Sequence, residues 1–152
     1  MDKMVTLNHE DLVIRTFMLF LQLALATTKY VDSRFYRAQK SSMIKYSALK
    51  FLVINGGIMK HSELARWTYT KKHNITTLVE RMKEEKLVTT ERNKKDKRII
   101  EIIITDKGRL TYKQATPVAR SIVQELMQDM DTSDVRKFEK LLNAIKTNIE
   151  RT

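Results

Sequence analysis

The sequence has no cysteine, which excludes disulfide bonds, thiol redox chemistry and thiolate metal sites in this chain. It also has only three glycines and one proline among its 152 residues. A protein built from many strands and tight turns would need more of both, so a mostly helical chain is favoured. Apolar residues make up 42% of the sequence, which is enough to build a core and argues against a disordered chain.

Long hydrophobic runs are also scarce. The longest apolar stretch, FMLFLQLALA at 17–26, is shorter than the roughly 20 residues that cross a bilayer, and it contains Gln22. It lacks the basic start and the cleavage site of a signal peptide. The sequence therefore predicts a cytoplasmic protein with no membrane partner.

Acidic residues are outnumbered by basic ones only in the middle of the chain. The formal charge is +11, and residues 29–98 alone hold 18 Lys and Arg against 7 Asp and Glu, while the rest of the chain holds 11 of each. Such a concentrated basic region indicates a polyanionic partner, usually nucleic acid. A merely soluble surface would spread its charge more evenly. A membrane-surface helix would place the basic residues opposite one apolar stripe, and they do not lie that way.

Long helices are predicted at both ends of the chain. The first covers 8–39, with Asn8 or the acids at 10 and 11 suited to its N-terminus. Its first half is apolar on nearly every side, so we expect burial on several sides, which a second copy of the chain would provide. The last helix, 132–149, carries apolar residues spaced three and four apart, a seam for another helix: Val135, Phe138, Leu142, Ile145 and Ile149.

The chain's only proline falls inside the remaining helical segment, 106–130, which Thr105 is placed to cap. Pro117 donates no N–H and clashes with the preceding turn of a helix. The pattern predicts either a kink at Pro117 or a new segment that Thr116 caps, with Pro117 at its first position.

The basic central region has the pattern of a helix-turn-helix. A short apolar helix at 46–54 ends at the sequence NGG, where glycine can take the left-handed conformation. A second short helix is predicted at 61–68, and a third at 69–86. The third has a polar, basic outer face and one apolar stripe, formed by Ile75, Leu78, Val79 and Met82.

Two β-branched runs follow, at 87–92 and 99–105, separated by the polar sequence NKKDKR. They predict a β-hairpin with a long, basic arm, and a helix-turn-helix followed by such a hairpin is a winged helix. Asp96 stands two residues before Arg98, a spacing at which the carboxylate can hold the guanidinium by a charge-assisted hydrogen bond.

This wing suggests a division of labour on DNA. Lys94, Lys95 and Lys97 would attract the phosphate backbone, while Asp96 orients Arg98 toward a minor groove. The alternative is a surface ion pair without a function. On the third helix, Asn suits adenine and Thr suits a thymine methyl in the major groove, and the candidate DNA contacts there are Lys71, Lys72, His73, Asn74, Thr76, Thr77 and Arg81.

From residue 46 to about 115 the chain resembles a MarR-type winged-helix transcription regulator. The resemblance rests on SELA (62–65), NITTLVERMKEEKLV (74–88), ERNKKDKR (91–98) and ITDKGR (104–109). The family often has glycine where Tyr69 and Lys86 stand in this chain.

The resemblance implies a single MarR-like domain over 1–152, mainly α with a small β-hairpin wing. Residues 41–110 would form the DNA-binding lobe, and 1–40 with 111–152 would form a helical dimerisation region. It further implies a homodimer that binds pseudo-palindromic double-stranded DNA, usually as a repressor, and that a small apolar or aromatic effector can release.

Rival function classes have less support in the residues. The histidines at 9, 61 and 73 are scattered, and we find no phosphate-cradling glycine loop and no paired carboxylates, so neither an enzyme nor a metal or cofactor site is predicted. Two alternatives stay open. The protein could bind DNA constitutively without an effector, or its winged helix could serve only to dock another protein.

Overall fold

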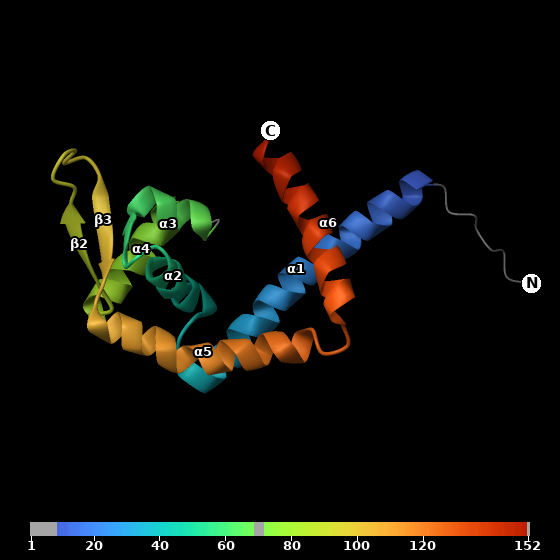
Figure 1. The fold of residues 1–152 in the computed structure, drawn as a ribbon, viewed down its shortest axis with the longest axis horizontal. Helices are drawn as coiled ribbons and strands as arrows, with labels where there is room; N and C mark the ends of the chain where they lie inside the picture. The colour runs from blue at the N-terminus through green and yellow to red at the C-terminus, as the bar shows by residue number, and fades with distance from the viewer. Residues whose placement is uncertain (1–8, 69–71, 152) are drawn as a thin grey trace, which may run out of the picture. The chain divides into compact units, whose positions relative to one another are not determined.

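The computed structural model describes residues 9–68 and 72–151. Mostly helical elements and one small antiparallel sheet confirm the fold class that the sequence predicted (Figure 1). In chain order the elements are α1 (His9–Gln39), α2 (Met43–Ile54), β1 (Ile58–Lys60), α3 (His61–Trp67), α4 (Lys72–Glu84), β2 (Val88–Arg92), β3 (Ile100–Ile104), α5 (Asp106–Leu126) and α6 (Thr132–Glu150). The chain divides into two compact units, Met1–Val118 and Ala119–Thr152.

The hydrophobic core of the first unit lies between α2, α3, α4 and the sheet. The apolar stripe predicted on α4 supplies much of it, because Ile75 and Met82 are fully buried and Leu78 and Val79 nearly so. This burial fixes the rotation of α4 and turns its opposite face to solvent. The remaining core residues are Ala48, Leu49, Leu52, Met59, Leu64, Leu87, Val88, Ile102 and Ile104.

The predicted hairpin is present as β2 and β3, which pair antiparallel from Val88 opposite Ile104 to Arg92 opposite Ile100. The sheet has a third strand that the sequence did not reveal. Strand β1 pairs with the other edge of β3, so the strand order is β1-β3-β2. Only Met59 of this three-residue strand is buried, which is too short a pattern to detect from alternation.

Two helix ends share one hydrogen-bonding pattern. At the end of α2, Gly57 N–H donates to Leu52 O at 2.7 Å, and Gly56 has a φ of 78°. At the end of α4, Leu87 N–H donates to Met82 O at 2.8 Å, and Lys86, with a φ of 61°, occupies the equivalent position. Both are Schellman caps, in which glycine is the usual residue at the left-handed position. The sequence predicted the first from NGG; in the second, lysine adopts the conformation.

Helix α5 begins in close contact with the end of α4. Thr105 Oγ1 accepts from Gly108 N–H at 3.0 Å, the N-cap expected from the sequence, and lies 2.8 Å from Lys86 O, to which it donates. Gly108 is required here because a Cβ at this position would lie 2.2 Å from Leu87 O. These contacts join the turn between α4 and β2 to the first turn of α5.

One expectation about α5 is wrong. The helix runs unbroken through Pro117, so no new segment begins there. Thr116 is not a cap, because its Oγ1 donates back to Tyr112 O at 2.8 Å. Tyr46 of α2 approaches the same hydroxyl at 3.4 Å and packs against the Tyr112 ring, which secures this part of α5 to the lobe.

The N-terminal half of α1 is exposed in the single chain; the sequence predicted that a second copy of the chain would bury it. Of its residues 11–39, only Phe35 is buried. By length and composition alone, Asp11–Gln39 could also cross a membrane, with a mean hydropathy of 1.4 over its best 18-residue window. The helix of a soluble core passes the same test. The predicted start at Asn8 lies outside the described residues.

In the second unit, Asp131 caps α6 by accepting from Asp134 N–H at 2.8 Å. The predicted seam also remains exposed here, with Val135, Phe138 and Ile149 all more than a third accessible.

Candidate nucleic-acid interface

The exposed face of α4 carries most of the predicted recognition residues. Asn74, Thr76, Thr77 and Arg81 are all exposed, on the side opposite the buried stripe. Lys71 lies outside the described residues, as do the side chains of Lys72 and His73, although both of these belong to α4.

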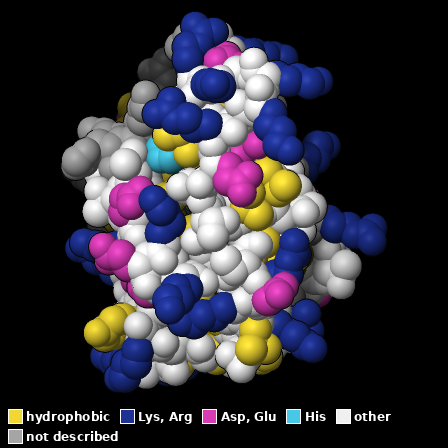
Figure 2. All heavy atoms as spheres, turned by 90° about the vertical axis from the view of Figure 1, so that its left-hand side faces the viewer, with side chains coloured by type: hydrophobic (Ala, Val, Ile, Leu, Met, Phe, Trp, Pro, Cys, Tyr) yellow, Lys and Arg dark blue, Asp and Glu magenta, His cyan; other side chains and the backbone are white. Residues whose placement is uncertain are grey.

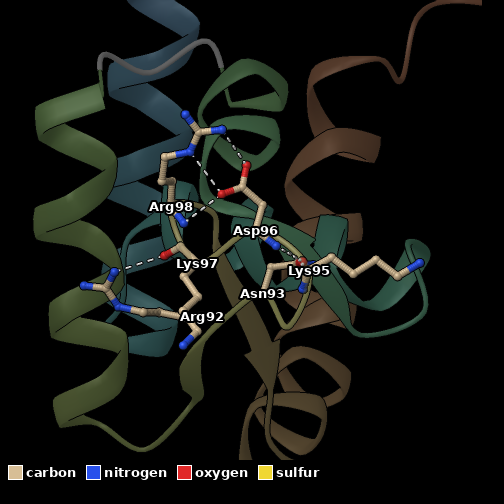
Figure 3. A network of polar contacts seen from close by, with 6 residues as sticks. All are labelled: Arg92, Asn93, Lys95, Asp96, Lys97 and Arg98. Atoms are coloured by element: carbon tan, nitrogen blue, oxygen red, sulfur yellow. Dashed lines mark hydrogen bonds and ion pairs between the residues drawn. The ribbon is translucent and has the colours of Figure 1, made fainter.

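The loop at the wing tip contains no glycine, and hydrogen bonds from side chains hold it in shape (Figure 3). Asn93 Oδ1 accepts from the backbone N–H groups of Lys95, at 2.9 Å, and Asp96, at 3.0 Å. Arg92 Nη1 donates to Lys97 O at 3.0 Å. Asn93 also donates through Nδ2 to Glu101 of β3 at 2.6 Å. Asn93 and Arg92 were missed as organising residues, since their partners are not apparent from composition.

Asp96 and Arg98 make the contact that their spacing predicted. Arg98 Nε donates to Asp96 Oδ1 and Nη2 to Oδ2, both at 3.1 Å, and Arg98 N–H donates to Oδ1 at 3.0 Å (Figure 3). The hydrogen bonds from the Arg98 side chain and backbone lower the pKa of Asp96. The Arg98 side chain is nevertheless 91% exposed, so the fork holds it in one orientation while leaving it accessible.

A groove of about 430 Å³ separates the wing from α4 and the start of α3. Its basic residues each lie near a carboxylate: Lys60 Nζ is 3.8 Å from Glu63, Lys83 Nζ is 3.1 Å from Glu80, and Arg98 binds Asp96. The groove is lined by Lys60, His61, Ser62, Thr76, Val79, Glu80, Lys83, Thr90, Arg98, Ile99 and Ile100.

His61 stands in this groove with Nε2 3.3 Å from Thr76 Oγ1. The contact joins the first residue of α3 to the exposed face of α4. Sequence reasoning missed His61, because it is 15 positions from Thr76 and the two residues meet only through the packing of the two helices.

Lys and Arg side chains dominate the side of the molecule on which the wing lies (Figure 2). Acidic side chains are fewer and lie among them. The central charge excess found in the sequence is thus displayed on an accessible face.

Residues 42–99, which contain the helix-turn-helix and most of the wing, match the family model described as the MarR family. Over this segment the chain is similar to the MarR family. Its members are transcription regulators and not enzymes, in agreement with the class predicted from the sequence.

A curated relative in this family is the HTH-type transcriptional repressor IacR of Pseudomonas putida. It is 28% identical over 89 residues, which are 59% of this chain and 53% of IacR. The match therefore spans about half the length of that protein.

Solved structures of other proteins share the fold. Sco3205 of Streptomyces coelicolor, a MarR family transcriptional regulator in complex with DNA, aligns with a TM-score of 0.83 at 17% identity, covering 93% of this chain and 89% of its own. BpsR of Bordetella bronchiseptica, whose DNA binding is regulated by 6-hydroxynicotinic acid, aligns with a TM-score of 0.76 at 16% identity, covering 87% of this chain and 98% of its own.

Proposed function

We propose that this protein binds double-stranded DNA in a sequence-specific manner and represses transcription as a homodimer on a pseudo-palindromic operator. The carrying observation is the joint exposure of the polar face of α4 and the oriented Arg98 at the two sides of one groove. The buried stripe fixes the rotation of α4, and the Asp96 carboxylate fixes the orientation of Arg98. Both groups are therefore oriented before a ligand binds.

The residues take different roles in this proposal. Asn74, Thr76 and Thr77 reach base edges in the major groove, together with Lys72, His73 and Arg81 of the same helix and Lys71, which precedes it in the sequence. Lys94, Lys95 and Lys97 contact phosphates, and Asp96 aims Arg98 at the adjacent minor groove. The lobe 41–110 carries all of these contacts.

Dimerisation uses the helical regions 1–40 and 111–152. The motive is the exposed apolar surface of α1, which a soluble chain must cover: Leu12, Val13, Ile14, Phe17, Met18, Leu19, Leu21, Leu23 and Leu25 are each at least 41% accessible. Obligate interfaces of this kind commonly bury above ~2,000 Å². Two-fold symmetry would then set the two α4 helices about 34 Å apart, one turn of DNA.

A small apolar or aromatic effector would bind between α1, α2 and α3. A cavity of about 530 Å³ lies there, with Trp67 and Phe51 in tilted contact at its wall. The regulation of BpsR by an aromatic acid supports this part of the proposal. Because Trp67 is the only tryptophan, its fluorescence reports occupancy of the cavity. If no small acid or phenol shifts either the fluorescence or the DNA affinity, constitutive binding is the better description.

The decisive test is duplex binding as a function of salt. If each half of the dimer neutralises about four phosphates, the slope of log K against log salt is about −7. Selection from a random duplex pool should yield a pseudo-palindrome with half-sites one turn apart. A slope near zero would contradict DNA binding and favour a protein-docking module.

A second test concerns α1. Sedimentation at micromolar concentration is expected to show a dimer that stays in the soluble, cytoplasmic fraction. A folded monomer would contradict the dimer, and recovery with membranes would instead assign α1 to the bilayer.

A further inference from the structure

We propose that His61 is a DNA-contacting residue of this interface, and that its protonation tightens duplex binding. The inference rests on the proposed DNA-binding function and adds a residue and a regulation to it. Three observations carry it: the position of His61 in the groove, its contact with Thr76, and the charge balance around it.

The position places His61 where the nucleic acid would lie. It lines the groove between α4 and the wing, together with the candidate DNA contacts Thr76 and Arg98. A duplex that receives α4 in its major groove and Arg98 in its minor groove brings a phosphate backbone across this space. An imidazole there would face a polyanion in the complex.

The contact with Thr76 gives His61 an influence on base readout as well. With Nε2 3.3 Å from Thr76 Oγ1, His61 restrains a hydroxyl that we place at base edges. A neutral imidazole can accept or donate at Nε2, depending on its tautomer, whereas an imidazolium can only donate. Protonation therefore fixes Thr76 Oγ1 as the acceptor in this contact.

Among the residues whose side chains the structure describes, the charged groups that line the groove with His61 and their acidic partners cancel. Lys60 comes from β1, Glu80 and Lys83 from α4, and Arg98 from the wing; Glu63 and Asp96 are the acidic partners of Lys60 and Arg98. Three positive and three negative groups sum to zero, so a proton on His61 makes this set net positive. Because a phosphate backbone favours the charged imidazole, binding DNA should take up a proton, and affinity should rise as the pH falls.

The experiment is a pH series of duplex binding by the full chain at constant ionic strength. An ordinary imidazole titrates near pH 6.5, so binding at pH 6 should be about five- to tenfold tighter per lobe than at pH 8. Calorimetry in buffers of different ionisation enthalpy should show the uptake of up to about one proton per lobe.

Variants of the three histidines assign the effect. His61→Gln keeps a polar group close to the position of Nε2 but does not titrate, and it should abolish the pH dependence and the proton uptake. His9→Gln, at the start of α1, should retain both. His73→Gln should also retain both, whatever it does to affinity.

The outcomes separate the two proposals. If wild-type protein binds duplex with equal affinity at pH 6 and pH 8, or if the pH dependence survives in His61→Gln, this inference is overturned while DNA binding stands. If no duplex is bound at any pH, the proposed function itself fails. Loss of the pH dependence in His73→Gln instead would move the role to α4.

Discussion

Lys86 adopts a backbone conformation that suits glycine, and replacing it tests how much strain the chain holds between α4 and the wing. Its φ of 61° places it in the left-handed region, at the cap where Leu87 N–H reaches Met82 O. A side chain in this conformation costs about 1–2 kcal/mol, while glycine adds about 0.4–1 kcal/mol of unfolded-chain entropy. Since the Lys86 side chain is exposed, Lys86→Gly should raise the free energy of unfolding by about 0.5–1 kcal/mol.

Thermal and denaturant unfolding at one fixed protein concentration provide the measurement, because association of the chains would make melting concentration-dependent. The expected rise in Tm is about 1–4 °C. Lys86→Ala is the matched control: it removes the same charge but keeps the Cβ, so it should not reproduce the gain. Lys83→Gly, inside α4, should lose about 1 kcal/mol. If Lys86→Gly is no more stable than Lys86→Ala, the left-handed backbone is not strained, and the reasoning fails.

Four further predictions concern the Asp96–Arg98 pair of the wing and the contact between Gly108 and Leu87. Arg98→Ala should weaken duplex binding by about 1–3 kcal/mol with little change in Tm; Asp96→Ala should weaken binding or broaden sequence selectivity, whereas tighter binding with unchanged selectivity would show a plain cationic arm. Gly108→Ala should destabilise the fold by about 1–3 kcal/mol in denaturant unfolding, because its Cβ would meet Leu87 O at 2.2 Å, and a neutral result would show that α5 shifts freely. Arg98 lowers the pKa of Asp96 in the folded protein. The contribution of this pair to folding stability is therefore fully present above the ordinary carboxyl pKa of 3.8 and is lost only as the pH falls through the lower folded pKa. The Arg98 Nε–H resonance should stay constant from pH 5 to pH 8 and change only in stronger acid.

Features that depend on local periodicity or spacing could be predicted from the sequence. The stripe of α4 follows from residues three and four apart, which share a helix face in any context. The Asp96–Arg98 fork follows from a separation of two residues in one loop, where few geometries are available. In both cases the partners are close in sequence, and tertiary packing decides little.

Features that depend on contacts between elements could not be predicted. Strand β1 exists because Met59 enters a core that five other elements build, and its three residues carry no periodicity of their own. His61 meets Thr76 only after α3 and α4 have packed. The cover of α1 also depends on contacts beyond the helix itself: its hydrophobicity predicts burial by a second copy, and the single chain leaves it exposed.

The paired charges of the groove separate orientation from attraction in this interface. An exposed ion pair is worth only about 0–1 kcal/mol, so Lys60 and Lys83 can exchange a carboxylate for a phosphate at little cost. Until then the carboxylates hold them in place and cancel much of their attraction for arbitrary DNA. The wing lysines Lys94 and Lys95 are exposed and would provide long-range attraction. The residues that are oriented before binding would then determine sequence selectivity, and the exposed wing lysines would raise the association rate.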